Sequence, residues 1–144
     1  MRIRRSITAA AAAVVLSGTG ALVLPAVASA HSAVHTLKFT AVTNKSTNFT
    51  GNSGGSQETD VNSAGKTIGF DVVYFKITGK NSAAVNAAFD LKGGLLYATA
   101  TTTNGGKTFK GKVTGGTGAF KGATGTIAAK TISGKKTAIT IIYS

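Results

Sequence analysis

The feature that most constrains the fold of this chain is a glycine-rich stretch that runs from residue 113 to residue 127. Glycine suits backbone that must adopt a positive φ or pass close to another backbone segment. The flanking residues 109–113 and 124–131 both alternate like strands, whereas a phosphate-binding loop would be followed by a helix. The stretch therefore predicts a tight corner between two β-strands. Its five glycines are Gly115, Gly116, Gly118, Gly122 and Gly125.

The first thirty residues have the three parts of a secretory signal peptide. Three arginines among the first five residues precede an apolar, alanine-rich segment over residues 7–24, and Pro25 ends it. Ala28-Ser29-Ala30 then fits the rule for cleavage after small residues, which leaves His31 as the mature N-terminus. We expect residues 1–30 to be a signal peptide of a style typical of bacteria. The protein is then secreted, with no membrane anchor after cleavage.

The remaining residues, 31–144, have the length of one domain with a modest core. They contain thirteen lysines, no arginine and four acidic residues, which gives a formal net charge of +9. Cysteine is absent, so no disulfide can stabilise the fold. Because cysteine is missing and the two histidines, His31 and His35, lie near one end, we expect no metal site. We expect no cofactor either.

Short alternating runs rich in Thr, Val, Ile and Ala, separated by Gly, Asn and Ser, predict an all-β fold. Residues 47–50 are expected to form a short edge segment, and residues 51–56 a loop because of their Gly/Ser composition. Eight antiparallel strands with short connections favour a small closed barrel, with a two-sheet sandwich as the alternative. The predicted strands are residues 34–43, 57–62, 66–78, 83–91, 94–103, 107–113, 124–131 and 136–143.

The lysines indicate which side of each strand faces water, since successive side chains point to opposite faces. Lys110 and Lys112 must face solvent, which turns Phe109 and Val113 inward. On residues 66–78 a solvated Lys76 places Asp71 on the same inward face as Val73, Phe75 and Ile77. The same reasoning turns Asp90 outward and Tyr143 inward.

The glycine corner, Gly-Gly-Thr-Gly-Ala-Phe-x-Gly-Ala-x-Gly over residues 115–125, resembles the signature of the allene oxide cyclase and dirigent β-barrel families. Two further segments are similar to those families: Gly65 to Gly69 with Asp60 before it, and Leu91 to Tyr97. The resemblance extends from about Gly55 to the C-terminus. It implies an eight-stranded antiparallel barrel, often trimeric, with an apolar cavity open at one end. Members cyclise an allene oxide, steer radical coupling or act on polyketide-like substrates.

This chain departs from both family patterns at the residues that carry activity. The dirigent pattern pairs cavity aspartates with arginine, and residues 31–144 contain no arginine. The first predicted strand also lacks an acidic residue. The cyclase pattern uses a cavity glutamate, but Glu58 is the only glutamate here, at an uncertain boundary between loop and strand. The resemblance therefore supports the fold of these families for this chain more strongly than it supports their known activities.

Asp71 is the best candidate for a catalytic residue. A carboxylate on an apolar face is unfavourable unless it is paired, and burial raises its pKa towards general acid/base use. Phe75, Tyr97 and Tyr143 are the candidate ligand-binding residues, with the two tyrosines offering hydroxyl donors to a carbonyl or epoxide oxygen. The alternative is that Asp71 only accepts hydrogen bonds from lysine, threonine or backbone groups near the barrel mouth.

Three classes of function follow. The first is a cofactor-free cyclase or isomerase that acts on a small apolar or phenolic molecule, and the second is a carrier that uses the same cavity without catalysis. The third is a non-catalytic cationic protein that associates with anionic cell-wall or extracellular polymers. Specific nucleic-acid binding is not expected, because the lysines are dispersed and surface aromatic residues are scarce. A homo-oligomer, a trimer by family resemblance, is also expected.

Overall fold

The computed structural model describes residues 32–144, and the predicted signal peptide and cleavage site lie outside them. Within the described range no helix is long and apolar enough to cross a membrane. The chain forms eight strands and one short 3-10 helix, η1 (Gly118–Phe120). The strands are β1 (His35–Phe49), β2 (Ser53–Val61), β3 (Thr67–Gly79), β4 (Ser82–Leu91), β5 (Gly94–Thr102), β6 (Thr108–Gly116), β7 (Gly125–Ser133) and β8 (Lys136–Tyr143).

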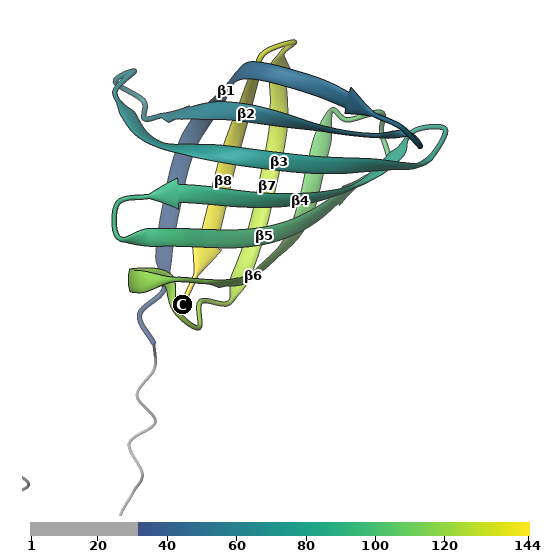
Figure 1. Cartoon of the computed structure of the whole chain (residues 1–144). Helices are drawn as coiled ribbons and strands as arrows, with labels where there is room; N and C mark the ends of the chain where they lie inside the picture. The colour runs from purple at the N-terminus through teal and green to yellow at the C-terminus, as the bar shows by residue number, and fades with distance from the viewer. Residues whose placement is uncertain (1–31) are drawn as a thin grey trace, which may run out of the picture. The chain divides into compact units, whose positions relative to one another are not determined.

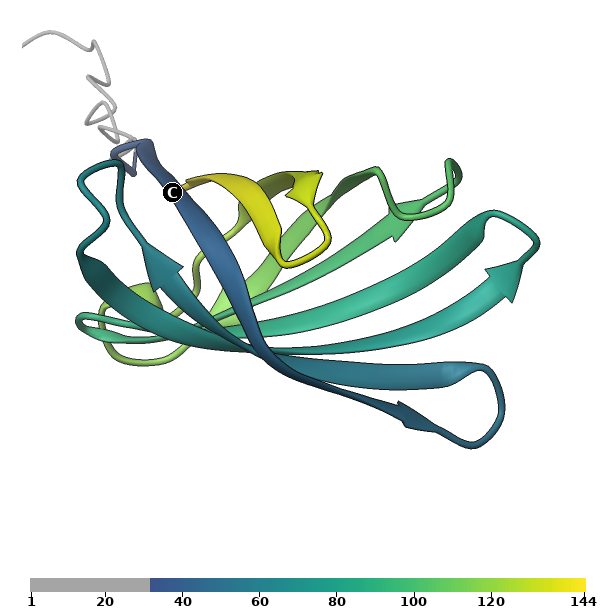
Figure 2. The same cartoon turned by 90° about the horizontal axis from the view of Figure 1, so that it is seen from above.

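The eight strands form one closed barrel in which each strand pairs antiparallel with its neighbours in sequence (Figure 1). β1 closes the sheet by pairing with β8 on one side and with β2 on the other. The first half of β1 pairs with β8 and the second half with β2, and Figure 2 shows β1 crossing between them. This confirms the predicted eight-stranded antiparallel barrel and excludes the sandwich. Closure gives every strand two neighbours, although residues 45–49 of β1 pair with β2 alone.

The connections define two ends of the barrel. The turns β1–β2, β3–β4, β5–β6 and β7–β8 lie at one end, which we call the upper end. The turns β2–β3 and β4–β5, together with η1 and the C-terminus, lie at the opposite, lower end.

The prediction for residues 47–56 was wrong. β1 continues without a break to Phe49, and β2 already begins at Ser53, so the turn is short. Gly54 and Gly55 lie in β2 at positions where a side chain would not fit. A Cβ on Gly54 would lie 2.5 Å from Phe75 Cζ and 2.8 Å from the Thr47 carbonyl oxygen. The glycines that indicated a loop therefore reflect close packing within a strand.

The glycine-rich corner connects β6 to β7, as predicted, and closes the lower end. Gly115 and Gly122 have φ values of 141° and 78°, which favour glycine over other residues. η1 follows β6 directly and buries Phe120, whose ring meets that of Tyr143 edge-on with centroids 5.6 Å apart. The corner therefore places an aromatic side chain across the lower end of the barrel.

The hydrophobic core fills the lower half of the barrel. Phe39 and Phe89 pack edge-to-face at its centre, with ring centroids 5.7 Å apart. The remaining core members come from β1, from β4 to β8 and from the glycine-rich corner. They are Ala41, Leu91, Leu96, Ala98, Val113, Phe120, Ala123, Ile127, Ile139 and Ile141.

The predicted strand faces agree with the structure. Lys110 and Lys112 are exposed, and Val113 is buried. Asp71 points to the interior and is 2% exposed, whereas Asp90 is exposed on the outer surface. The alternation of charged and apolar residues was sufficient to orient these strands.

Candidate functional site

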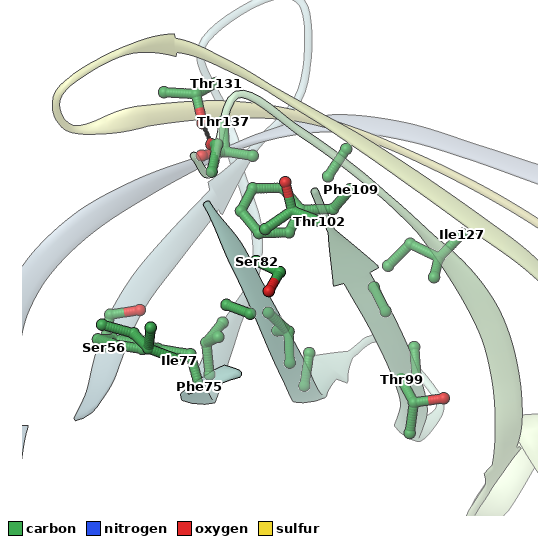
Figure 3. A pocket seen from close by; sticks show the side chains of 18 of the residues that line it. Ser56, Phe75, Ile77, Ser82, Thr99, Thr102, Phe109, Ile127, Thr131 and Thr137 are labelled. Atoms are coloured by element: carbon green, nitrogen blue, oxygen red, sulfur yellow. Dashed lines mark hydrogen bonds between the residues drawn. The ribbon is translucent and has the colours of Figure 1, made fainter. Parts of the chain in front are cut away.

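The upper half of the barrel, above the core, holds a cavity of about 460 Å³. Its mouth is formed by the β3–β4 and β5–β6 turns, which contribute Lys80, Asn81 and Gly105. Most of its wall is apolar, and the hydroxyl groups of Ser56, Ser82, Thr102, Thr131 and Thr137 also line it (Figure 3). The apolar lining includes Val73, Phe75, Ile77, Val85, Phe89, Phe109, Ile127 and Ile139.

Two of the four predicted site residues belong to this region. Phe75 lines the cavity from β3, as its strand face predicts. Asp71 lies on the same inward face of β3, two residues below Val73, which is itself part of the cavity wall. Asp71 does not line the cavity, because it sits beneath the floor, beside Phe89 on the neighbouring strand.

The two predicted tyrosines do not reach the cavity. Tyr97 lies on the outer face of β5 and is 36% exposed, in a shallow outer groove with Val72 and Tyr74. The inward face of β5 belongs to its neighbours Leu96 and Ala98, so a tyrosine between them must point outward. Tyr143 packs on the core at the lower end, where His35 stacks on it at a centroid distance of 5.2 Å.

Three carboxyl groups meet at the cavity floor. Glu58 of β2 and Asp71 of β3 are direct cross-strand partners, which places their Cβ atoms about 5 Å apart. Asp60 follows Glu58 on the same inward face of β2 and lies opposite Gly69, which has no side chain to separate Asp60 from Asp71. Asp60 is 0% exposed, and Glu58 reaches the cavity wall. The cluster thus extends from the cavity into the core.

Burial and mutual repulsion control the charge of the two aspartates. The four carboxyl oxygens of Asp60 and Asp71 are buried, and no other residue of the described barrel donates a hydrogen bond to them. Desolvation, then the nearby charges of Glu58 and Asp60, raises the pKa of Asp71 to about 9. Desolvation also raises the pKa of Asp60, to about 6, although a hydrogen bond from protonated Asp71 opposes this. At neutral pH the pair therefore holds a proton on Asp71. The carboxyl group of Asp71 can then donate a hydrogen bond to the carboxylate of Asp60.

Glu58 belongs to the candidate site and was not among the predicted site residues. Its Oε1 accepts hydrogen bonds from Ser56 Oγ at 2.7 Å and from Thr43 Oγ1 at 3.1 Å. These two hydroxyls fix the carboxylate at the boundary between the cavity and the buried aspartates. The signal was present in the alternation Ser56, Glu58, Asp60, but the preceding Gly/Ser run placed the start of the predicted strand at residue 57 and left Glu58 at its boundary.

The carboxyl cluster does not form a metal site. Across residues 32–144, no group of three or more His, Cys, Asp or Glu side chains is arranged to hold a metal ion. The cluster instead combines a carboxylate at the cavity wall with a carboxylic acid behind it. Such a pair can accept a proton from one atom of a bound molecule and return a proton to another.

No protein family and no curated protein sequence matches the chain. Solved structures of similar fold include a pyocyanin demethylase, with a TM-score of 0.66 and 16% identity, covering 76% of this chain and 100% of that one. The exo-specific intermolecular Diels-Alderase AbnU has a TM-score of 0.64 and 11% identity, covering 78% and 98%. The pterocarpan synthase dirigent protein GePTS1 has a TM-score of 0.62 and 16% identity, covering 77% and 87%. At such low identities the likeness establishes architecture alone, and this chain has the dirigent-like eight-stranded barrel fold.

Proposed function

We propose that the protein binds a small apolar or phenolic molecule in the upper cavity and catalyses a cofactor-free cyclisation or isomerisation of it. The observation that carries this proposal is the carboxyl cluster at the floor of an otherwise apolar cavity of about 460 Å³. Buried, unpartnered carboxyls are unfavourable for stability, so their presence beside a cavity supports a chemical role.

The proposed mechanism assigns different roles to Glu58 and Asp71. Glu58 lines the cavity, accepts a proton from one atom of the bound molecule and returns it to another, while Asp71, protonated at neutral pH beneath the floor, keeps the charge of the carboxyl cluster low. Isomerisation moves a proton between two atoms of the ligand, so neither an oxidant nor a reductant is consumed. The apolar walls, including Phe75, exclude water from the reacting group.

The structural neighbours support a ligand-binding cavity, but they do not favour one particular reaction. Their names refer to a demethylase of pyocyanin, an intermolecular Diels-Alderase and a pterocarpan synthase, which are three different chemistries. The substrate of this chain must therefore be argued from its own lining residues.

A binding titration tests the proposal at its first step. The neutral fluorescent probe N-phenyl-1-naphthylamine should bind residues 31–144 saturably with one site per chain and gain fluorescence in the apolar cavity. Ala100→Trp should abolish this binding because Ala100 lines the cavity. Thr101→Trp is the matched control, since Thr101 is exposed on the outer face of the same strand. Equal binding to both variants would contradict the proposal.

The catalytic role of Asp71 is tested once a substrate is found. Asp71→Asn keeps the size of the side chain and removes its titrating group, so turnover should fall about a hundredfold or more. Asp90→Asn, on the outer surface, should leave turnover unchanged. Full activity of Asp71→Asn would overturn this assignment.

We further propose that the protein is secreted after cleavage behind Ala30, as residues 1–30 indicate. The mass of the protein recovered from culture medium should correspond to a chain that starts at His31. Recovery of the full-length chain inside cells would contradict export.

A second candidate function is association with anionic cell-wall or extracellular polymers. All thirteen lysines are exposed, whereas Asp90 is the one exposed acidic residue among the four. The outer faces of β1, β6, β7 and β8 carry lysines and no acid. These lysines form the basic face, which consists of Lys38, Lys45, Lys110, Lys112, Lys130 and Lys136. Binding to isolated cell wall that disappears as salt shortens the Debye length would support this function, and binding that persists would oppose it.

We also propose that the protein forms a homo-oligomer through the outer face of β3–β5. Phe70, Val72, Tyr74 and Tyr97 are exposed there and form the apolar face, and Asp90 lies beside Phe70. Exposed apolar patches of this kind mark association sites. The outer face of β3–β5 carries one charge of each sign, Lys76 and Asp90, so a second copy can approach it with less repulsion than the basic face on the other strands would cause.

A further inference from the structure

The cavity has opposite charges at its two ends. On its floor stand Glu58 and, beneath it, the aspartate pair. At the mouth Lys80 lines the wall from the β3–β4 turn. Every lysine of the described barrel is exposed, so none reaches the floor to neutralise the carboxyls. A ligand in this cavity therefore has a negative floor beneath it and apolar walls around it.

The floor is prepared to accept hydrogen-bond donors. Ser56 and Thr43 both donate to Oε1 of Glu58, at 2.7 and 3.1 Å, and so hold the carboxylate in place. Within the described barrel this leaves Oε2 for a donor on a ligand. Directly behind Glu58, the buried pair of Asp60 and Asp71 receives no hydrogen bond from any other described residue.

The walls of the cavity indicate what the body of the ligand must be like. The aromatic rings of Phe75, Phe89 and Phe109 line the cavity, and the alanines Ala83, Ala87, Ala98, Ala100 and Ala129 leave the space between them open. Such a wall suits an apolar or aromatic body. An anionic group on the inner end of this body would face two or more carboxyls without a cation to compensate.

We propose that the cavity selects molecules with an aromatic or apolar body and a cationic nitrogen at the inner end, where this nitrogen pairs with Glu58. This inference rests on the proposed function, since it names the ligand class of the same cavity. It separates this chain from barrels that hold anionic substrates, because here the inner end repels a carboxylate and attracts an ammonium or iminium group.

The test compares three ligands of one shape that differ in charge. 2-Naphthylmethylammonium, 2-naphthylmethanol and 2-naphthoate compete against bound N-phenyl-1-naphthylamine at neutral pH and low salt. The cation should bind most tightly and the anion most weakly, with about a tenfold step or more between cation and neutral ligand. Equal affinities, or tightest binding of 2-naphthoate, would overturn the inference.

A charge-removing variant then assigns the selectivity to Glu58. Glu58→Gln should lose most of the preference for the cation and keep the affinity for 2-naphthylmethanol. Asp90→Asn removes the same charge from the outer surface and should keep the full preference. An unchanged preference in Glu58→Gln would overturn the assignment, whereas the ranking in the unaltered protein decides the proposal even if this variant does not fold.

Failure of the ligand class and failure of the proposed function give different results. If N-phenyl-1-naphthylamine binds and the three competitors rank equally, the cavity function stands and the charge selectivity is wrong. If neither the probe nor any competitor binds, the cavity function is wrong and the selectivity falls with it.

Discussion

Asp60 and Asp71 occupy one buried space from neighbouring strands, and neither carboxyl finds a hydrogen-bond donor outside the pair among the described residues. The pair relieves its repulsion by holding a proton on Asp71, whose pKa is raised to about 9 by burial and by the nearby charges. This arrangement keeps a carboxylic acid protonated at neutral pH directly behind the carboxylate of Glu58. Both the proposed chemistry and the stability of the barrel depend on this proton.

The first prediction concerns stability and pH. From about pH 4 to pH 9 the folded protein holds a proton on Asp71 that the unfolded chain has released, since an unperturbed aspartate titrates near 3.8. Stability is therefore highest at the acidic end of this window and falls by up to about 1.4 kcal/mol per pH unit as pH rises. Asp60 adds a loss of the same sign up to its own pKa of about 6. Thermal melts across this pH range measure the slope.

Asp71→Asn should remove most of this slope above about pH 6, because the amide does not titrate. At about pH 8 it should also unfold at a higher temperature than the unaltered protein, since folding no longer requires a carboxyl that is ionised in the unfolded chain to take up a proton. Asp90→Asn is the matched control and should keep the slope. A melting temperature that does not change with pH in the unaltered protein would contradict the buried proton.

The second prediction concerns the packing of β5 against β6. A Cβ on Gly111 would overlap the Thr99 carbonyl oxygen, and it would lie 2.5 Å from Ala100 Cα. Gly111→Ala should therefore lower the free energy of unfolding by about 2–4 kcal/mol, because backbone atoms must move apart. Gly134→Ala, in the β7–β8 turn with open space around it, should change it by less than about 0.5 kcal/mol. Urea denaturation compares the two, and equal effects would show that β5 and β6 do not approach this closely.

The third prediction concerns the basic face. Replacing Lys110 and Lys112 by glutamine should lower the salt concentration that releases the protein from isolated cell wall, because two adjacent charges are lost from one surface. The control replaces Lys66 and Lys92, at the lower end of the barrel, by glutamine. A larger effect of the first pair would locate binding on the basic face. The same shift in both variants would indicate general charge attraction without a defined surface.

The fourth prediction concerns the apolar face. Val72→Lys introduces a charge among exposed apolar side chains and should convert an oligomer to monomer in sedimentation velocity. Ile142→Lys makes the same kind of change at an exposed apolar position next to the basic face and should leave the assembly intact. A protein that is monomeric before any substitution would contradict self-association.

Most of the fold and part of the candidate site could be predicted from the sequence. Strand faces could be predicted because each lysine must reach water, which oriented β3 and β6 and turned Asp71 inward. The corner at residues 115–125 could be predicted because its glycines match backbone that other residues rarely adopt. These are local properties, and they need no knowledge of distant contacts.

What could not be predicted depends on contacts between distant strands. Gly54 is in a strand because Phe75 passes over it, and composition alone indicated a loop. The role of Glu58 depends on its pairing with Asp71, which requires the register of β2 on β3. The prediction that Tyr97 binds the ligand in the cavity was wrong for a different reason. It rested on the hydroxyl group of Tyr97, but the alternation of β5 turns this side chain to the outer surface. The position of the cavity above the core likewise emerges only once all eight strands close.

The protonation state of the aspartate pair is the most direct test of this account. Carboxyl carbon NMR on protein labelled at aspartate follows each of Asp60, Asp71 and Asp90 through a pH titration, with Asp71→Asn and Asp90→Asn providing the assignment. The account predicts that Asp71 remains protonated at about pH 7 and titrates near 9, with Asp60 titrating near 6. If all three aspartates titrate below about pH 5, as unperturbed carboxyls do, the buried proton is absent and the proposed chemistry is wrong.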